Sequence, residues 1–329
     1  KNYFEVGNSG ICHQLMIENG FAAPGRLIIG ADSHTCSYGA LGSFSTGVGS
    51  TEAASAMALG KLWFRVPETQ KFIVNGNLPS YVMGKDVILN IIGDIGVDGA
   101  LYKSMEFHGT TLKSMPLSDR ITIANMAIEA GGKAGVFSPD DTVFNYLDGR
   151  VKGDYNPIYP DKNAEYIDTF EYQAEDLIPT VAKPSLPENI SPVSELANLT
   201  IDQAYLGSCT NGRIEDLRLA AGILSGRKIH NNVRMIVVPA SKEVFNQAIK
   251  EGLVKTFLDS NAFVSGPTCG ACLGGYMGVL AKGERCISST NRNFVGRMGH
   301  QESEVYLANP AVVAASAVKG RITDPNEIL

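Results

Sequence analysis

Short apolar runs that lead into glycine-rich loops alternate with helix-like segments through the last third of the chain. The runs and their loops read AYLGSCTNG from Ala204, RMIVVPAS from Arg234, FVSGPTCGACLGG from Phe263 and RCISSTNRNFVGR from Arg285. Between them, residues 215–226 and 242–260 carry the charged and apolar periodicity of helices. This alternation predicts βαβ units, and therefore a parallel sheet whose ligand-binding loops gather at the carboxyl ends of its strands.

Two of these loops hold cysteines whose spacing indicates a metal site. Cys209 lies in GSCTNGR, while Cys269 and Cys272 form a CxxC pair in GPTCGACLGG. Closed zinc sites and electron-transfer iron–sulfur sites use four protein ligands, and no fourth cysteine lies nearby in the sequence. Three thiolates therefore leave one metal position open to water or substrate, as Lewis-acid catalysis requires.

Two alternative roles for the cysteines stay open on spacing alone. A structural zinc site could use His230 or His300 as a fourth ligand, although Cys209 has no CxxC partner of its own. A thioredoxin-like redox pair fits less well, because Cys269 does not begin a clean helix in a small domain. The six cysteines form no regular framework, which favours a reduced cytoplasmic protein with a metal site over a secreted disulfide scaffold.

A second group of candidates lies nearer the start of the chain. Asp32, Ser33 and His34 are consecutive in the loop GADSHTC, where they could relay a proton or bind a substrate. A serine hydrolase is disfavoured, since its triad is assembled in space and the chain lacks a GxSxG elbow. His13, at the start of an expected helix, and Glu106, in MEFHG, are further candidates, and each of these residues alone also fits a structural role.

The segment SSTNRNFVGR predicts a loop that binds carboxylates. Arg292 and Arg297 stand five residues apart around a glycine-containing turn, and two guanidinium groups suit bidentate capture of a dicarboxylate. Asn291 is next to Arg292 and can donate to a ligand or to a cluster sulfur. Surface arginines are the plain alternative, but their crowding among Ser, Asn and Gly directly after the CxxC unit favours binding.

Length and charge set the remaining limits. A chain of 329 residues, 44% hydrophobic and 19% charged, is typical of a globular protein with two or three domains. The net charge of −6 argues against a basic nucleic-acid-binding face, and no run reaches the roughly 20 apolar residues of a membrane span. We expect three α/β domains at residues 1–68, 69–186 and 187–329, with a proline-rich linker at 183–194.

Local patterns predict further elements in the first half of the chain. Helices are expected at 13–19, 51–64, 80–92 and 118–130, and strands at 26–30 and 71–78. The last of these helices should stop at Gly131, because a glycine after the periodic segment is a common C-terminal signal.

Taken together, the motifs resemble the aconitase superfamily, and most closely its branch of 3-isopropylmalate dehydratase large subunits. GADSHTCSYGALGSFSTGVGSTE, MEFHG, GSCTNGR, GPTCGACLGG and SSTNRNFVGR occur in the family's order, and the resemblance covers essentially the whole chain. It implies a three-domain α/β core with parallel and mixed sheets that lacks the family's fourth, swivelling domain. It also implies a [4Fe-4S] cluster with one labile iron, held by Cys209, Cys269 and Cys272.

The same resemblance implies roles for the other candidate residues. Catalysis would involve Asp32, His34, Glu106 and His13. Substrate would be bound by Ser33, Arg292 and Arg297, and Asn291 would support the cluster. The implied reaction is the reversible dehydration of a hydroxy diacid, followed by rehydration with the hydroxyl on the neighbouring carbon.

The expected substrate is 2-isopropylmalate, isomerised to 3-isopropylmalate in leucine biosynthesis. Citramalate, homocitrate, dimethylmalate and citrate are alternative substrates of related hydro-lyases. The family's Asp-His pair and a substrate-contacting Gln precede the DSH motif, and its serine base belongs to the swivelling domain, so we expect these groups to lie outside this chain. A small-subunit partner would supply that domain and contact the variable part of the substrate.

Two functions without this chemistry remain alternatives. Some relatives of the same fold bind RNA, but the acidic balance of this chain argues against a large phosphate-binding face. An electron-transfer protein is disfavoured because a fourth cysteine ligand is missing from the motif. We therefore expect neither a nucleic-acid partner nor a membrane partner.

Overall fold

The computed structural model describes residues 2–328, so the first and last residues of the expected domains lie outside it. The described residues form two compact units, each assembled from separate stretches of the sequence. Unit 1 comprises the residues up to Leu15, Ser80–Asp94 and the residues from Ile178 onward, and unit 2 comprises Met16–Pro79 and Ile95–Leu177. The boundaries expected at residues 68 and 186 stay a prediction.

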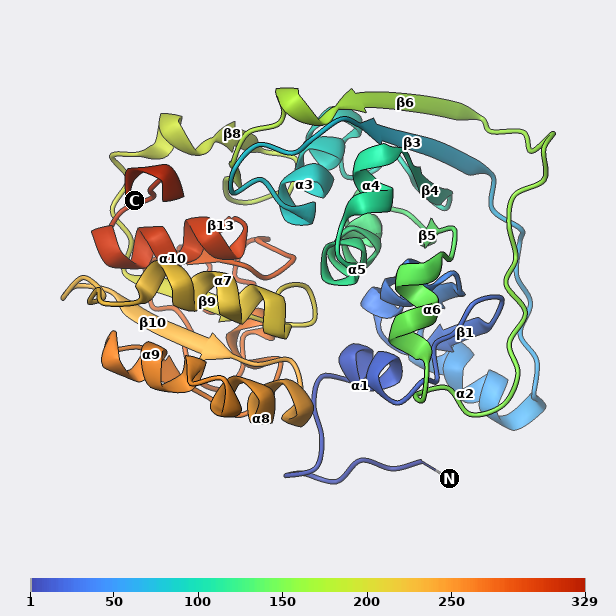
Figure 1. Ribbon diagram of the computed structural model, residues 1–329, viewed down its shortest axis with the longest axis horizontal. Coiled ribbons are helices and arrows are strands. Elements are labelled where there is room, and N and C mark those ends of the chain that lie inside the picture. Colours follow the sequence, from blue (N-terminus) through green and yellow to red (C-terminus); the bar gives the residue numbers. More distant parts are fainter. Residues whose placement is uncertain (1, 329) are drawn as a thin grey trace. The chain divides into compact units, whose positions relative to one another are not determined.

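A seven-stranded mixed sheet is the centre of unit 1 (Figure 1). In spatial order its strands are β11 (Phe263–Val264), β10 (Arg234–Val238), β9 (Gln203–Gly207), β12 (Arg285–Ser288), β13 (Glu304–Leu307), β7 (Thr180–Ala182) and β8 (Ile190–Pro192). The pairs from β11 to β13 are parallel, whereas β7 pairs antiparallel with both β13 and β8. The parallel and mixed sheets expected from the sequence are confirmed.

The order of these strands creates a switch point between β9 and β12. From β9 the chain moves outward through β10 to β11, and it then returns to the other side of β9 to form β12 and β13. Loops that leave neighbouring parallel strands in opposite directions open a crevice at their carboxyl ends, where α/β folds bind ligands. The loops after β9 and β12 are those that carry Cys209 and Asn291.

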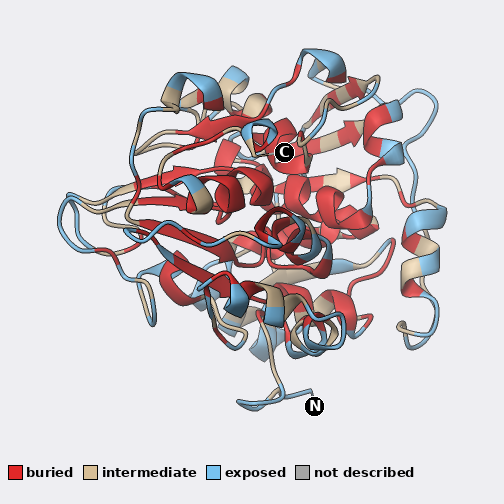
Figure 2. Cartoon of the chain, turned by 60° about the vertical axis from the view of Figure 1, so that its left-hand side comes forward, coloured by how far each residue is buried: buried red, intermediate tan, exposed pale blue. Residues whose placement is uncertain are grey.

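Helices flank this sheet because their apolar faces need a partner. They are α3 (Gly84–Ile95), α7 (Ile214–Leu224), α8 (Lys242–Lys250), α9 (Leu253–Asp259) and α10 (Pro310–Lys319). Eight residues of α10 are buried, and α10 and α7 join the strands in one apolar core, coloured by burial in Figure 2. The single helix expected at 242–260 is wrong, because Gly252 adopts a left-handed conformation (φ 76°) that separates α8 from α9.

Unit 2 contains two parallel sheets. The larger has the order β5 (Ala134–Phe137), β4 (Ser104–His108), β3 (Thr69–Asn75) and β6 (Asp168–Gln173), and the smaller pairs β1 (Leu27–Gly30) with β2 (Phe44–Gly47). Its helices are α2 (Ser50–Leu59), α4 (Thr110–Ser114), α5 (Leu117–Met126) and α6 (Asp141–Leu147). Helix α1 (Cys12–Glu18) runs along the chain from unit 1 into unit 2.

Three local expectations need correction. Helix α2 ends at Leu59 rather than at residue 64, because Gly60 closes it in a left-handed conformation. The loop that carries Asp32 continues into a 3₁₀ helix, Ser33–Leu41, which packs against α5. The expected linker at 183–194 includes β8, so part of it belongs to the sheet of unit 1. Among residues 2–328, no helix has both the length and the apolar composition needed to cross a membrane.

Asp86, on α3, gives the fold a pH dependence that can be measured. Its carboxylate is fully buried and accepts hydrogen bonds from the backbone N–H groups of Met83 (2.8 Å) and Thr180 (2.9 Å) and from the side chain of Asn309 (2.8 Å). Burial raises the pKa of Asp86 from 3.8 to about 6, although these hydrogen bonds oppose the shift. The folded chain therefore binds a proton that the unfolded chain has lost between those two pH values.

We expect the Asp86→Asn variant to lack this effect. Because the folded pKa exceeds the unfolded pKa, the stability contribution is present below pH 4 and is lost as the pH rises through 6, which amounts to roughly 3 kcal/mol. Thermal unfolding of the metal-free protein should therefore show the native chain losing stability relative to Asp86→Asn between about pH 4 and pH 6. Parallel pH profiles for the two proteins would contradict this assignment.

Candidate functional site

Cys209 is presented by a sharp turn at the end of β9. Gly207 (φ 153°) and Ser208 (φ 85°) both have positive φ angles, so the chain bends directly before the cysteine. A Cβ atom on Gly207 would lie 2.5 Å from the carbonyl oxygen of Val238, which makes glycine necessary at this position. Arg213 then fixes the turn by donating to the Cys209 carbonyl oxygen at 2.8 Å.

The CxxC pair lies in the loop after β11. Cys269 precedes a short 3₁₀ helix, Gly270–Leu273, which contains Cys272. The Tyr205 hydroxyl, from β9, donates to the Cys269 carbonyl oxygen at 3.3 Å and so ties this loop to the central strand. Cys269 also packs against the buried cluster that contains Cys209.

Asn291 lies in the loop after β12 and contacts two of the cysteine sulfurs. Its amide nitrogen lies 3.6 Å from the Cys209 sulfur, and its amide oxygen lies 3.7 Å from the Cys272 sulfur. None of the three cysteines forms a disulfide within residues 2–328, and Cys209 and Cys272 are buried. Of the three cysteines predicted as ligands, Cys209 and Cys272 thus converge on Asn291 from two loops, and Cys269 lies in the same loop as Cys272.

The charges around the thiols suit an anionic metal–thiolate group. Burial raises the pKa of the Cys272 thiol, while the guanidinium of Arg297 and the ammonium of Lys85 act to lower it. The pKa of Tyr205 is also raised, first by burial and then by the charges of Cys272 and Cys269. Within residues 2–328, the buried Nε of Arg297 has no hydrogen-bond partner, so a donor is left beside the thiols.

This set of donors fits an iron–sulfur cluster with an open iron better than a zinc site. Three sulfur atoms, an amide and an unsatisfied guanidinium nitrogen face one region of unit 1. The histidines considered as a fourth zinc ligand are both exposed. His230 and His300 each use Nδ1 to accept a backbone N–H, from Asn232 and Glu302 respectively.

Two further candidates lie in unit 1, as the cysteines do. His13 is buried on α1, and one of its ring nitrogens lies within 4.8 Å of the Cys209 sulfur. Arg292 follows Asn291 directly and is half-buried, with its guanidinium 6.0 Å from the ring centre of Phe294. Arg292 and Arg297 therefore belong to the loop that also carries Asn291.

Asp32, Ser33 and His34 lie in unit 2, at the start of the 3₁₀ helix. Asp32 caps that helix, because its carboxylate accepts the backbone N–H of His34 at 2.8 Å. The Asp32 side chain is 53% exposed and, with Ser33, lines a cavity of about 550 Å³ that Lys133 also borders. His34 is buried, and its Nε2 lies 2.9 Å from a carboxylate oxygen of Glu129.

Glu106 is also in unit 2, on β4. Its carboxylate lies 2.8 Å from Nε2 of His108, two residues along the same strand and therefore on the same face of the sheet. The pKa of Tyr166 is raised by burial and by the charge of Glu106, which places the phenol beside that carboxylate. Glu106 thus belongs to a pair with His108, and His34 belongs to a separate pair with Glu129.

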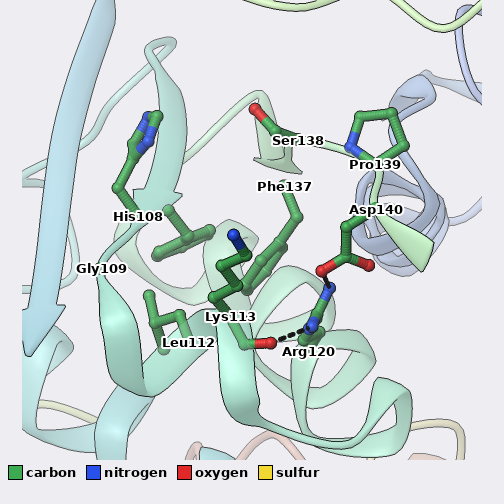
Figure 3. Close-up of a pocket in the computed structure, with 10 residues that line it drawn as sticks. His108, Gly109, Leu112, Lys113, Arg120, Phe137, Ser138, Pro139 and Asp140 are labelled. Atoms are coloured by element: carbon green, nitrogen blue, oxygen red, sulfur yellow. Dashed lines mark hydrogen bonds and ion pairs between the residues drawn. The ribbon is translucent and has the colours of Figure 1, made fainter. Parts of the chain in front are cut away.

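A second cavity in unit 2 contains none of the predicted residues (Figure 3). Its volume is about 260 Å³, and it lies beyond the carboxyl ends of β4 and β5. The buried guanidinium of Arg120 donates to Asp140 at 2.9 Å and to the Lys113 carbonyl oxygen at 2.6 Å, so it holds the wall of the cavity together. We assign no part of the reaction to this cavity.

Three residues were missed at the level of the sequence. Lys85 is fully buried on α3, Glu129 is the partner of His34, and His108 is the partner of Glu106. A signal existed for each, since a charged residue within an apolar segment needs a buried partner, and residues two apart on a strand share a face. The identity of each partner could be found only from the folded chain.

Comparison with known proteins identifies a matching family and similar sequences. The model of the aconitase family (aconitate hydratase) matches residues 2–200 and 194–320. The chain is 60% identical over 328 residues to the 3-isopropylmalate dehydratase large subunit of Halothermothrix orenii, covering 100% of this chain and 78% of that protein. The large subunits of Hydrogenobaculum sp. (59% identity) and Aquifex aeolicus (57% identity) match 100% of this chain and 77% of their own lengths.

A solved structure resembles the fold. The crystal structure of Thermococcus kodakaraensis aconitase X in its holo-form superposes with a TM-score of 0.51 at 11% sequence identity, covering 86% of this chain and 66% of that one. At that identity the likeness concerns the fold alone. The family model covers nearly the whole chain, and relatives with more than half of the aligned residues identical match this chain from end to end. The chain belongs to the aconitase family.

Proposed function

We propose that this chain is the cluster-binding large subunit of a 3-isopropylmalate dehydratase. It would isomerise 2-isopropylmalate to 3-isopropylmalate by dehydration and rehydration, in leucine biosynthesis. The observation that carries the proposal is the contact of the Asn291 amide with the sulfurs of Cys209 and Cys272, beside the switch point of the sheet of unit 1. Relatives with 56–60% identity that bear this name support the choice of substrate.

Cys209, Cys269 and Cys272 would hold a [4Fe-4S] cluster with one labile iron. When bound, the cluster supplies a Lewis acid at its open iron, which makes hydroxide a better leaving group. Asn291 would fix two of the ligand sulfurs through its amide, and His13 would border the site from α1.

The chain's arginines would handle the charge of the substrate. Removal of a proton next to a carboxylate creates negative charge, and preorganised cations stabilise that charge in a site from which water is excluded. Arg292 and Arg297 are both half-buried in the loop after β12, and the Arg297 guanidinium lies beside the Cys272 thiol. We propose that Arg292 and Arg297, together with Ser33, bind the diacid.

The residues of unit 2 would provide acid–base chemistry for the same reaction. Asp32, His34 and Glu106 are the proposed catalytic groups, and two of them are held by a buried or half-buried partner. A histidine whose Nε2 donates to Glu129 keeps its Nδ1 as the nitrogen that takes up or releases a proton. Nδ1 of His34 lies 3.5 Å from the Asp32 carboxylate, which is open to the cavity.

We further propose that a small subunit completes the enzyme and that the reaction takes place in the cytoplasm. The names of the relatives, as large subunits, imply such a partner. The six cysteines form no disulfide among residues 2–328, and three of them lie at the proposed cluster site, which suits a reducing compartment. The variable part of the substrate would be recognised by the small subunit.

The test combines the full-length protein with a separately produced small subunit. After anaerobic reconstitution with iron and sulfide, the mixture should convert 2-isopropylmalate at a rate at least tenfold above its rates with citramalate, homocitrate, dimethylmalate or citrate. Neither subunit alone should turn over substrate, because each supplies only part of the catalytic groups. Full activity of the large subunit alone, or a clear preference for another diacid, would contradict the proposal.

A further inference from the structure

Lys85 is a buried cation that the proposed mechanism does not yet use. It lies in the first turn of α3 and is 0% exposed, although an ammonium group loses much of its hydration energy on burial. Buried lysines persist only where hydrogen bonds and charge partners offset that loss. The neighbours of Lys85 therefore indicate why the chain keeps a charge inside unit 1.

The ammonium of Lys85 is directed at the loop after β12. It donates to the carbonyl oxygen of Ser289 at 3.2 Å and to the carbonyl oxygen of Thr290. The Thr290 carbonyl belongs to the peptide unit that also contains the backbone nitrogen of Asn291. Lys85 thus fixes the orientation of the peptide plane from which the Asn291 side chain projects.

Other hydrogen bonds also fix the backbone of residues 289–291. The Ser289 hydroxyl accepts the backbone N–H of Gly207 at 3.0 Å, next to the turn that presents Cys209. Ser289, Thr290 and Asn291 are all buried, so water cannot replace a lost partner of their backbone groups. A small rotation of the Thr290 carbonyl would move the Asn291 amide away from the sulfurs of Cys209 and Cys272, to which it lies only 3.6 Å and 3.7 Å.

We propose that Lys85 is a positioning residue of the cluster site, holding the 289–291 backbone so that Asn291 contacts the sulfurs of Cys209 and Cys272. This inference rests on the proposed function. Groups that support the residues around a metal commonly change metal affinity by 10- to 100-fold when they are removed. The positive charge of Lys85 would act in the same direction, because a cluster held by thiolates is anionic.

The experiment measures how long the reconstituted full-length protein keeps its cluster. We expect Lys85→Met to lose its visible iron–sulfur absorbance in air at least fivefold faster than the native protein, with less iron bound per chain. Lys103→Met is the matched control, because it removes another lysine-to-carbonyl hydrogen bond (to Gly99, 3.2 Å) in unit 2 and should leave cluster loss unchanged.

A double-mutant comparison separates positioning from general destabilisation. If Lys85 acts through Asn291, the Lys85→Met/Asn291→Ala protein should lose its cluster no faster than Asn291→Ala alone. Additive effects of the two changes, or equal cluster retention in Lys85→Met and native protein, would overturn the inference while the proposed function stood. Absence of any cluster in the reconstituted native protein would overturn both.

If Lys85→Met does not fold, Lys85→Arg provides a second measurement. Arginine retains the charge and its donors but places them differently, so cluster loss should be faster than in the native protein. Folding is checked by circular dichroism of the metal-free form. A folded Lys85→Arg protein with native cluster retention and native iron content would count against positioning by Lys85.

Discussion

Replacing Cys272 with serine is expected to abolish the visible iron–sulfur absorbance of the reconstituted protein and to remove its hydro-lyase activity. Cys272 is buried, and its sulfur shares Asn291 with the sulfur of Cys209, so its loss leaves two thiolates to hold a group that needs three. A serine hydroxyl is a much weaker ligand for iron than a thiolate, because it stays protonated and is harder. Iron content and the absorption spectrum after anaerobic reconstitution measure this effect directly.

Two other cysteines serve as controls for the loss of a thiol in general. Cys286 is buried in β12 of the same unit, where its sulfur lies 3.7 Å from the Gln203 amide. Cys12 is exposed on α1. Cys286→Ala and Cys12→Ser should both reconstitute with the native spectrum. A cluster that forms in Cys272→Ser to the native extent would show that the metal is bound elsewhere.

The parts of the fold that could be predicted are those governed by local pattern. The strands at residues 203–207 and 285–288 are short, apolar and followed by glycine-rich loops, so their parallel pairing and the convergence of their loops followed from the sequence. The predicted helix ends were wrong where the backbone conformation of a single residue determines the end of the helix. At Gly60 and Gly252, a left-handed glycine interrupts a helix that the apolar pattern alone would have continued.

The pairings between distant residues could not be predicted in the same way. Lys85 meets Thr290 across 205 positions, and His34 meets Glu129 across 95. Such pairs depend on which helix the tertiary fold brings beside a loop, and hydrophobic periodicity carries no information about that choice. The sequence thus identifies the ligands and acid–base groups by residue type and motif, whereas their supporting partners emerge only with the fold.

The largest effect expected in unit 2 comes from His34. We expect His34→Asn to lower kcat of the reconstituted two-subunit enzyme by about 10² to 10⁴, the usual contribution of a positioned acid–base group. The cluster spectrum should remain unchanged, because the change removes a proton-transfer group and no sulfur ligand. Steady-state kinetics beside the absorption spectrum separate this outcome from the loss of metal.

Glu129→Gln distinguishes orientation of the histidine from its chemistry. The Glu129 side chain is 2% exposed and accepts a hydrogen bond from Nε2 of His34. The glutamine side chain of the variant has the same volume, but its NH₂ group can donate to Nε2 and so stabilise the wrong tautomer of the histidine. We expect kcat to fall about 10- to 100-fold with little change in KM. Because Glu129 would act through His34, the double variant should be no slower than His34→Asn alone, whereas independent roles would multiply the two losses.

Glu175→Gln is the control for the loss of a carboxylate in unit 2. Glu175 is exposed and accepts the backbone N–H of Asn77, so its variant should retain native kinetics. A loss of kcat in Glu175→Gln equal to that in Glu129→Gln would refute the pairing of Glu129 with His34.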